Sequence, residues 1–130
     1  MNNLTNPSEL IEKYNAKLVE HLETFFQGAT IFQDLVQEDE SKLSKINHVV
    51  FKTGGFERVS GVTYKQDVTV YYFSENREDL DLLQLTFMSS LGPTGHTCSK
   101  TRKDQMRKRD TEFFVDVIEF ELTRTVKHVC

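Results

Sequence analysis

The 130-residue sequence contains no tryptophan, only two prolines and only two cysteines. Two cysteines, Cys98 and Cys130, are too few for a disulfide framework, so reduced thiols of a cytoplasmic protein are expected. No apolar run reaches the ~18–20 residues that cross a bilayer, and the first residues lack the basic and apolar segments of a secretory signal. The composition therefore predicts a small cytoplasmic protein without a membrane partner.

The sequence also lacks the common catalytic motifs. It contains no G-x-G-x-x-G, no G-x-x-x-x-G-K-[ST], no H-E-x-x-H and no G-x-S-x-G. Two H-x-C pairs, His96 with Cys98 and His128 with Cys130, would supply the four ligands of a zinc site. A hairpin turning near residue 107 places Cys98 opposite residue 116, away from Cys130, so a polar strand end and a frayed terminus are preferred. We predict no enzyme, no catalytic residue, no cofactor and no metal.

What the chain does have is a moderate apolar content, 38%, with ten phenylalanines. Its length fits one domain, since single domains cluster near ~100–150 residues. We therefore expect one α+β domain over residues 1–130, with a flexible N-terminus at 1–5.

Two amphipathic helices are expected. The first begins at Pro7 after an Asn6 cap and ends near Gly28. The second is capped by Ser74 or Asn76 and ends at Gly92-Pro93. Its apolar stripe is unusually broad, so a second surface, such as another subunit, is expected to cover part of it. The stripe is formed by Leu80, Leu83, Phe87 and Leu91 and is widened by Leu82, Leu85 and Met88.

Residues 29–46 are less clear: Ile31, Phe32, Leu35 and Val36 have the spacing of a short helix, followed by a polar connector. The short apolar run 48–52 and the alternating run 62–73 are expected to be strands of a hairpin, with Gly54, Gly55 and Gly61 in the turn region. Runs 94–99 and 111–126 form a second hairpin. The predicted order is α-β-β-α-β-β, a small mixed or antiparallel sheet of about four strands with both helices on one face.

The net charge of −4 is unevenly distributed, because residues 100–109 contain six basic side chains and a single acidic one. We expect these residues in a hairpin loop at about 99–110. Three interpretations remain open: contact with nucleic-acid phosphates, docking on an acidic partner or another copy, and a solvated loop. Docking is preferred. The candidate interface residues are Lys100, Arg102, Lys103, Arg107, Lys108 and Arg109, together with Leu82, Leu85 and Met88.

A small-molecule site is the third hypothesis for function. The aromatic residues Tyr64, Tyr72, Phe87 and Phe120 could line a pocket between the sheet and the helices. A packed core is the simpler interpretation of the same residues.

The order of elements resembles that of a known family. An amphipathic helix opens the chain, the strand YKQDVTVYYF lies at 64–73, the helix start EDLDLL lies at 78–83, and a long strand covers 113–122. Over residues 7–127 this pattern resembles the tail terminator proteins of long-tailed bacteriophages, also called tail-completion or tail-to-head joining proteins. The likeness lies in the pattern of elements, so no functional position is transferred residue by residue.

The resemblance implies an oligomeric ring, expected to be a hexamer, that caps the tail tube and ends its polymerisation. Its partners would be further copies of this chain, the tail tube protein and the stopper protein of the head connector. DNA would pass through the lumen without sequence-specific binding. The protein would be made in the cytoplasm of the host bacterium and reside in the tail or neck of the virion. Another neck or head-completion connector protein is the alternative, as is a nucleic-acid-binding accessory protein acting through residues 100–109.

Overall fold

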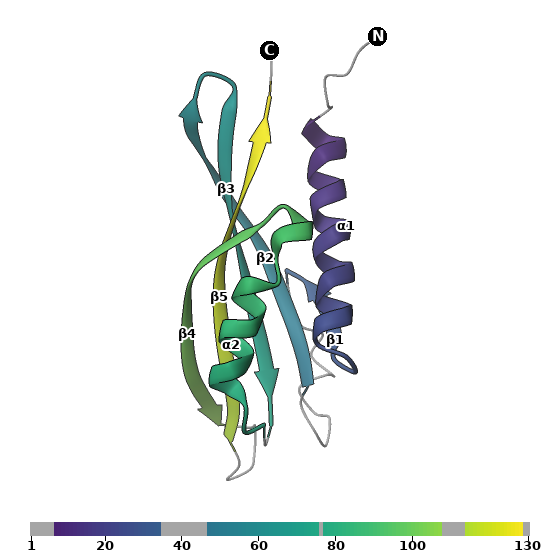
Figure 1. The fold of residues 1–130 in the computed structure, drawn as a ribbon, viewed down its shortest axis with the longest axis vertical. Helices are drawn as coiled ribbons and strands as arrows, with labels where there is room; N and C mark the ends of the chain where they lie inside the picture. The colour runs from purple at the N-terminus through teal and green to yellow at the C-terminus, as the bar shows by residue number, and fades with distance from the viewer. Residues whose placement is uncertain (1–6, 35–46, 76, 108–113, 129–130) are drawn as a thin grey trace.

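The residues that the structure describes form two helices and a five-stranded mixed sheet, which confirms the α+β class. The computed structural model describes residues 7–34, 47–75, 77–107 and 114–128. Figure 1 shows the helices beside the long strands. In chain order the elements are α1 (Pro7–Phe25), β1 (Thr30–Gln33), β2 (Asn47–Ser60), β3 (Thr63–Ser74), α2 (Leu80–Ser89), the 3-10 turn η2 (Gly92–Thr94), β4 (Thr97–Arg107) and β5 (Phe114–Lys127).

The sheet has the strand order β1-β2-β3-β5-β4. Strand β1 runs parallel to β2, and the other neighbours are antiparallel. The predictions of about four strands and of a short helix at residue 31 were therefore wrong. Ile31 and Phe32 pair with Val49 and Val50 of β2, a nonlocal contact that their local spacing does not reveal. Leu35 and Val36 lie outside the described residues.

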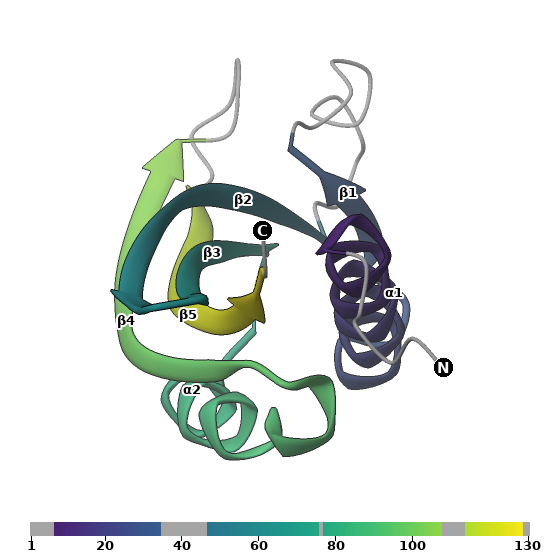
Figure 2. The same ribbon diagram turned by 90° about the horizontal axis from the view of Figure 1, so that it is seen from above.

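Both helices pack against the same face of the sheet. Leu18 and Leu22 of α1, and Phe26 just after its end, join Leu83 and Phe87 of α2 in one buried cluster. The strands contribute side chains that lie opposite one another in register, Val49, Phe51, Val68, Val70, Tyr72, Ile118, Phe120 and Leu122. Viewed from above, α1 lies toward β1 and α2 lies toward β4 (Figure 2).

The first hairpin was predicted, but its turn lies further along the chain. Strand β2 continues through Gly54 and Gly55 with a register shift between Thr53 and Phe56, and the chain reverses at Gly61. An added Cβ at Gly54 would lie 3.1 Å from the backbone oxygen of Asp67. The glycine at that position therefore serves close strand pairing rather than a turn.

Helix α2 begins later than expected. Its N-cap is Asp79, which makes no side-chain capping hydrogen bond. Ser74, one of the two predicted caps, is the last residue of β3, and the other, Asn76, lies outside the described residues. Strand β3 lies one residue further along the chain than the predicted run 62–73, and β5 pairs with it as far as Ser74.

The predicted loop at 99–110 is the largest error of the sequence analysis. Residues 97–107 form strand β4, which pairs with β5 from Thr97 to Arg107. A cross-strand ladder satisfies the backbone groups of this polar segment, so it adopts the strand conformation despite its composition. Lys108 and Arg109 lie outside the described residues.

A glycine at the entry to β4 provides a test of the packing of α1. Gly95 has φ +81°, and an added Cβ would lie 2.6 Å from the Tyr14 ring. The Tyr14 hydroxyl donates a hydrogen bond of 2.8 Å to the Thr125 carbonyl. We expect Gly95→Ala to lower the free energy of unfolding by about 2–3 kcal/mol, because the left-handed backbone costs roughly 1–2 kcal/mol and a displaced Tyr14 loses this hydrogen bond, worth about 1 kcal/mol. Urea denaturation measures this difference.

Gly92→Ala is the matched control, since Gly92 has no atom within 4 Å of an added Cβ and no positive φ. We expect this variant to differ from the native chain by no more than about 0.5 kcal/mol. Equal losses in both variants would contradict the proposed contact between Gly95 and Tyr14.

Candidate interaction surfaces

Strand β4 forms an edge of the sheet and carries four of the six predicted basic residues. Alternation along the strand separates them: Lys103 points toward the helix-covered face and reaches Asp81 of α2, whereas Arg102 lies opposite Glu119. The cations therefore do not form one patch. Such charges also protect an edge strand from unwanted pairing.

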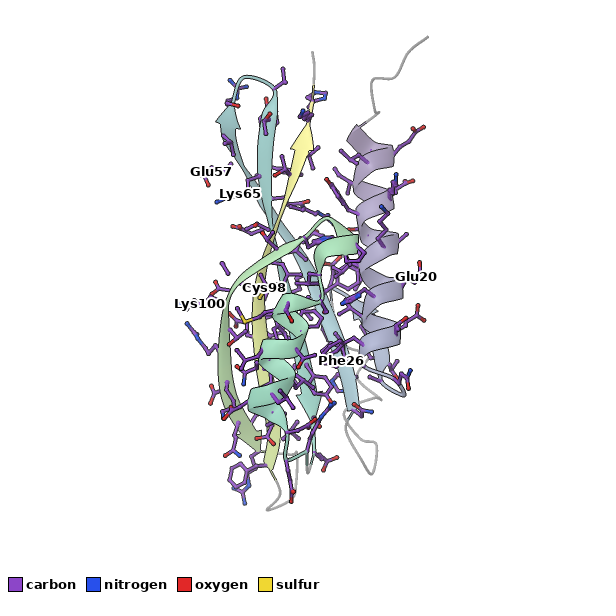
Figure 3. The ribbon with its side chains drawn as sticks, in the orientation of Figure 1. Glu20, Phe26, Glu57, Lys65, Cys98 and Lys100 are labelled. Atoms are coloured by element: carbon purple, nitrogen blue, oxygen red, sulfur yellow. The ribbon has the colours of Figure 1, made fainter. Side chains whose placement is uncertain are left out.

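Acidic side chains balance part of this charge. Lys103 Nζ lies 2.9 Å from Asp81 Oδ1, and Lys100 Nζ lies 4.0 Å from Glu121 Oε2. Both pairs are exposed, so each contributes at most about 1 kcal/mol to stability. Figure 3 shows Lys100 reaching outward from β4. Divided between two faces and partly paired, these cations form a weaker phosphate-binding surface than the predicted loop.

Helix α2 presents the predicted apolar residues to solvent. Leu82 and Leu85 are 65% and 68% exposed, whereas Met88 is half-buried. The two leucines are three residues apart and therefore lie on one side of the helix. Because Lys103 and Thr101 of β4 bind Asp81 and Gln84 of α2, the structure brings the predicted leucines and part of the predicted basic segment together. We call Leu82 and Leu85 the α2 knob.

A second apolar surface, which the sequence patterns did not indicate, lies at the hairpin of β2 and β3. Phe56 is 52% exposed, and Val59 and Val62 are also exposed. Beside the hairpin lies a cavity of about 360 Å³, here called the hairpin groove, lined by Ile11, Phe56, Tyr64, Val126 and His128. Phe56 and Val59 lie within a glycine-bounded segment that was expected to form a turn. Apolar residues in such a turn were the feature of the sequence that could have indicated this exposed apolar surface.

Arg58 borders the hairpin groove. Its guanidinium lies 5.3 Å from the centre of the Tyr64 ring and donates a hydrogen bond of 2.9 Å to the Tyr64 hydroxyl. Arg58, Tyr64 and Val126 occupy register positions on three adjacent strands. None of the lining residues is a carboxylate. The groove is therefore apolar with a basic side chain at its rim.

The described chain also contains a buried polar cluster around Arg124, which is 2% exposed. Arg124 Nε donates to Gln66 Oε1 at 2.9 Å, and Nη1 donates to Asn15 Oδ1 at 2.7 Å. The guanidinium lies 5.5 Å from the centre of the Tyr14 ring. These contacts connect β5 to β3 and to α1.

His96 belongs to the same cluster. Its Nδ1 lies 3.0 Å from the Thr94 carbonyl, which makes Nδ1 the protonated nitrogen, and Nε2 then accepts from Arg124 Nη1 at 3.4 Å. Burial, and secondly the Arg124 charge, lower the pKa of His96 to about 4. Among the described residues no group of His, Cys, Asp and Glu side chains is arranged to hold a metal ion. Cys130, part of the rejected zinc hypothesis, lies outside the described residues.

His21 and Ser90 form a pair that resembles a catalytic base and nucleophile. His21 Nε2 lies 2.8 Å from Ser90 Oγ, beside a cavity of about 300 Å³ lined in part by His21. The Ser90 hydroxyl, however, donates its one proton to the Phe87 carbonyl at 2.8 Å. Nε2 must then be the donor, which is opposite to the arrangement that activates a serine. The pair is best explained as a contact between α1 and the end of α2.

The aromatic pocket weighed as an alternative is mostly a packed core. The rings of Phe87 and Phe120 are 4.4 Å apart between centres, and Tyr72 lies against Phe26 at 4.5 Å. Figure 3 labels Phe26 between the helices and the sheet. Tyr64 lies apart from these residues, in the hairpin groove. The structure thus does not bring the four predicted pocket residues together.

The face of the sheet opposite the helices has a hollow of its own. Its volume is about 350 Å³, and its lining residues come from β3, β4 and β5: Tyr71, Phe73, Arg102, Asp104, Gln105, Met106, Val117 and Glu119. Burial, and then the charge of Glu119, raise the pKa of Tyr71. Its charged lining residues are two carboxylates, Asp104 and Glu119, and one cation, Arg102, so the hollow offers no basic surface to an anion.

No family model matches the chain, and no curated protein matches its sequence. In the described part of the chain, neither helix combines the length and the apolar character needed to span a membrane.

Proposed function

We propose that this chain is a non-catalytic assembly protein of the tail terminator type, found in the tail or neck of a long-tailed bacteriophage. Copies of the chain form a closed ring of about six subunits that caps the tail tube. The ring ends tube polymerisation and offers its other surface to the stopper protein of the DNA-filled head. DNA passes through the lumen without sequence-specific binding. The protein is made in the cytoplasm of the host bacterium.

The observation that carries this proposal is the presence of two separate apolar surfaces on one small domain, the α2 knob and the hairpin. Different surfaces that contact each other on neighbouring copies give head-to-tail assembly, which closes into a ring when the rotation between copies allows it. The open edge of β4 adds a surface for a further partner. The described polar groups at His21 and Arg124, in contrast, are arranged for packing.

The test has two parts. Native mass spectrometry of the purified chain is expected to show one closed species of about six copies. Electron microscopy of phage particles is expected to show tails of irregular, extended length when the gene is deleted and of uniform length when it is restored. Tails of unchanged length that fail to join heads would contradict termination and would favour the head-completion alternative.

Nucleic-acid binding through β4 is tested separately. We expect β4 not to bind DNA. Binding of duplex DNA should then be weak, and equally weak for the native chain and for a variant with Arg102, Lys103 and Arg107 changed to Ala. Duplex binding that weakens steeply with salt and disappears in the variant would instead support the accessory-protein alternative.

A further inference from the structure

Of the two helices that the structure describes, only α1 reaches the end of the sheet that carries the hairpin. At ~1.5 Å per residue, α1 spans roughly 28 Å and α2 only roughly 15 Å, whereas β2 at ~3.3 Å per residue spans roughly 46 Å. Helix α2 lies at the opposite end of the sheet from the hairpin (Figure 1). The hairpin groove is therefore bordered on one side by Ile11 of α1, and within residues 7–34, 47–75, 77–107 and 114–128 no second helix lies beside it.

We propose that the α2 knob of a second copy of this chain docks into the hairpin groove. This inference rests on the proposed ring and names the contact that builds it. Leu82 and Leu85 project from one side of α2, and the groove offers an apolar hollow lined by Phe56, Tyr64 and Val126. Docking would remove from water apolar side chains that each isolated copy exposes, which is the main driving force for association.

The charges beside the α2 knob and beside the hairpin groove favour a second copy of this chain as the occupant of the groove. Asp81 lies one turn before Leu85 on α2, and its side chain remains 84% exposed although it contacts Lys103. Arg58 lies at the rim of the groove, which is lined by no carboxylate. An acidic residue beside the knob thus fits a basic residue beside the groove, and such complementarity sets the orientation of docking.

The contact joins two different surfaces, so each copy donates its knob to one neighbour and receives a knob from the other. A heterologous contact of this kind predicts complementation between two defective chains. Leu85→Glu disables the knob, and Phe56→Glu disables the groove. Each variant alone is expected to self-associate at least about 30-fold more weakly than the native chain, the loss typical of a central interface residue.

The experiment measures mass by analytical ultracentrifugation for each variant and for their equimolar mixture. Each variant alone is expected to be monomeric. The mixture is expected to form dimers and nothing larger, because one intact knob meets one intact groove and the two remaining surfaces are both disabled. Lys65→Glu is the matched control on the same hairpin, since Lys65 pairs with Glu57 away from the groove (Figure 3), and it is expected to assemble as the native chain does.

Other outcomes overturn the contact. Dimers of Leu85→Glu alone would indicate a symmetric hairpin-to-hairpin interface, and dimers of Phe56→Glu alone a symmetric contact between α2 helices. Rings formed by both variants would place the interface elsewhere and leave the proposed function intact. A native chain that remains monomeric at all concentrations would contradict the contact and the ring together. Circular dichroism of each variant verifies that a loss of assembly is not a loss of folding.

Discussion

Phe87→Ala is expected to lower the free energy of unfolding by about 3–5 kcal/mol, the range found when a fully buried aromatic ring is truncated. Phe87 is 0% exposed and lies where the two helices and the sheet meet. Its ring centre lies 4.4 Å from that of Phe120, 5.1 Å from Phe25 and 5.4 Å from Phe26. Truncation therefore removes the ring contacts of α2 with Phe120 of β5 and Phe25 of α1 and leaves a cavity in the core. Urea denaturation followed by circular dichroism measures the loss.

Phe114→Ala makes the same chemical change at an exposed position of β5. We expect it to alter the free energy of unfolding by no more than about 0.5 kcal/mol. If the two variants were equally stable, Phe87 would not be the contact that fixes α2 to the sheet. The comparison also concerns assembly, because α2 can present Leu82 and Leu85 only while Phe87 anchors its other side.

Acidification from pH 6.5 to pH 4 is expected to destabilise the protein through His96 by at most about 3 kcal/mol, given ~1.4 kcal/mol per pH unit of pKa difference. The pKa of His96 is about 4 in the folded chain and ~6.5 in an unfolded one. Between these values the unfolded state binds the additional proton, so the free energy of unfolding falls as the pH falls. Well above pH 6.5 and well below pH 4, His96 is in the same protonation state in the folded and unfolded chain and adds nothing to the pH dependence of the free energy of unfolding.

His96→Gln isolates this effect, since the variant keeps a hydrogen-bonding side chain but cannot titrate. Burial also lowers the pKa of His21, so a smaller slope of the same sign is expected to remain in the variant. Urea denaturation at a series of pH values measures both curves, and nuclear magnetic resonance follows the His96 ring directly. A His96 ring that titrates near pH 6.5, or an unchanged slope in the variant, would contradict the buried contact with Arg124.

Local patterns predicted both helices and the strand pairs of the two hairpins, but not the extent of β2 and β4. Pro7 begins α1 as expected, and the apolar residues spaced by three and four along both helices face the sheet. Alternation predicted β3 and most of β5. The broad apolar stripe of the second helix also indicated that Leu82 and Leu85 would not be covered by the chain's own core, and both are exposed. Patterns of this kind are visible because neighbouring residues carry them.

Some elements form only through partners that are distant in sequence. Strand β1 has four residues and exists through parallel pairing with β2. The polar segment 97–107 is a strand because β5 supplies its ladder, and this placement distributes its cations over two faces. The local sequence of this segment predicts a charged loop, because the residues of β5 that pair with it lie elsewhere in the chain.

The sequence by itself determined the α+β class, both helices and the exposed leucines of α2, because the period of the apolar residues fixes which side of each element avoids water. Only the tertiary structure decided the fifth strand, the burial of His96 beside Arg124, and the hairpin groove. The groove joins Ile11, Phe56 and Val126 from three separate elements. Such a surface depends on how far each helix extends along the sheet, and that distance follows from packing rather than from any local pattern.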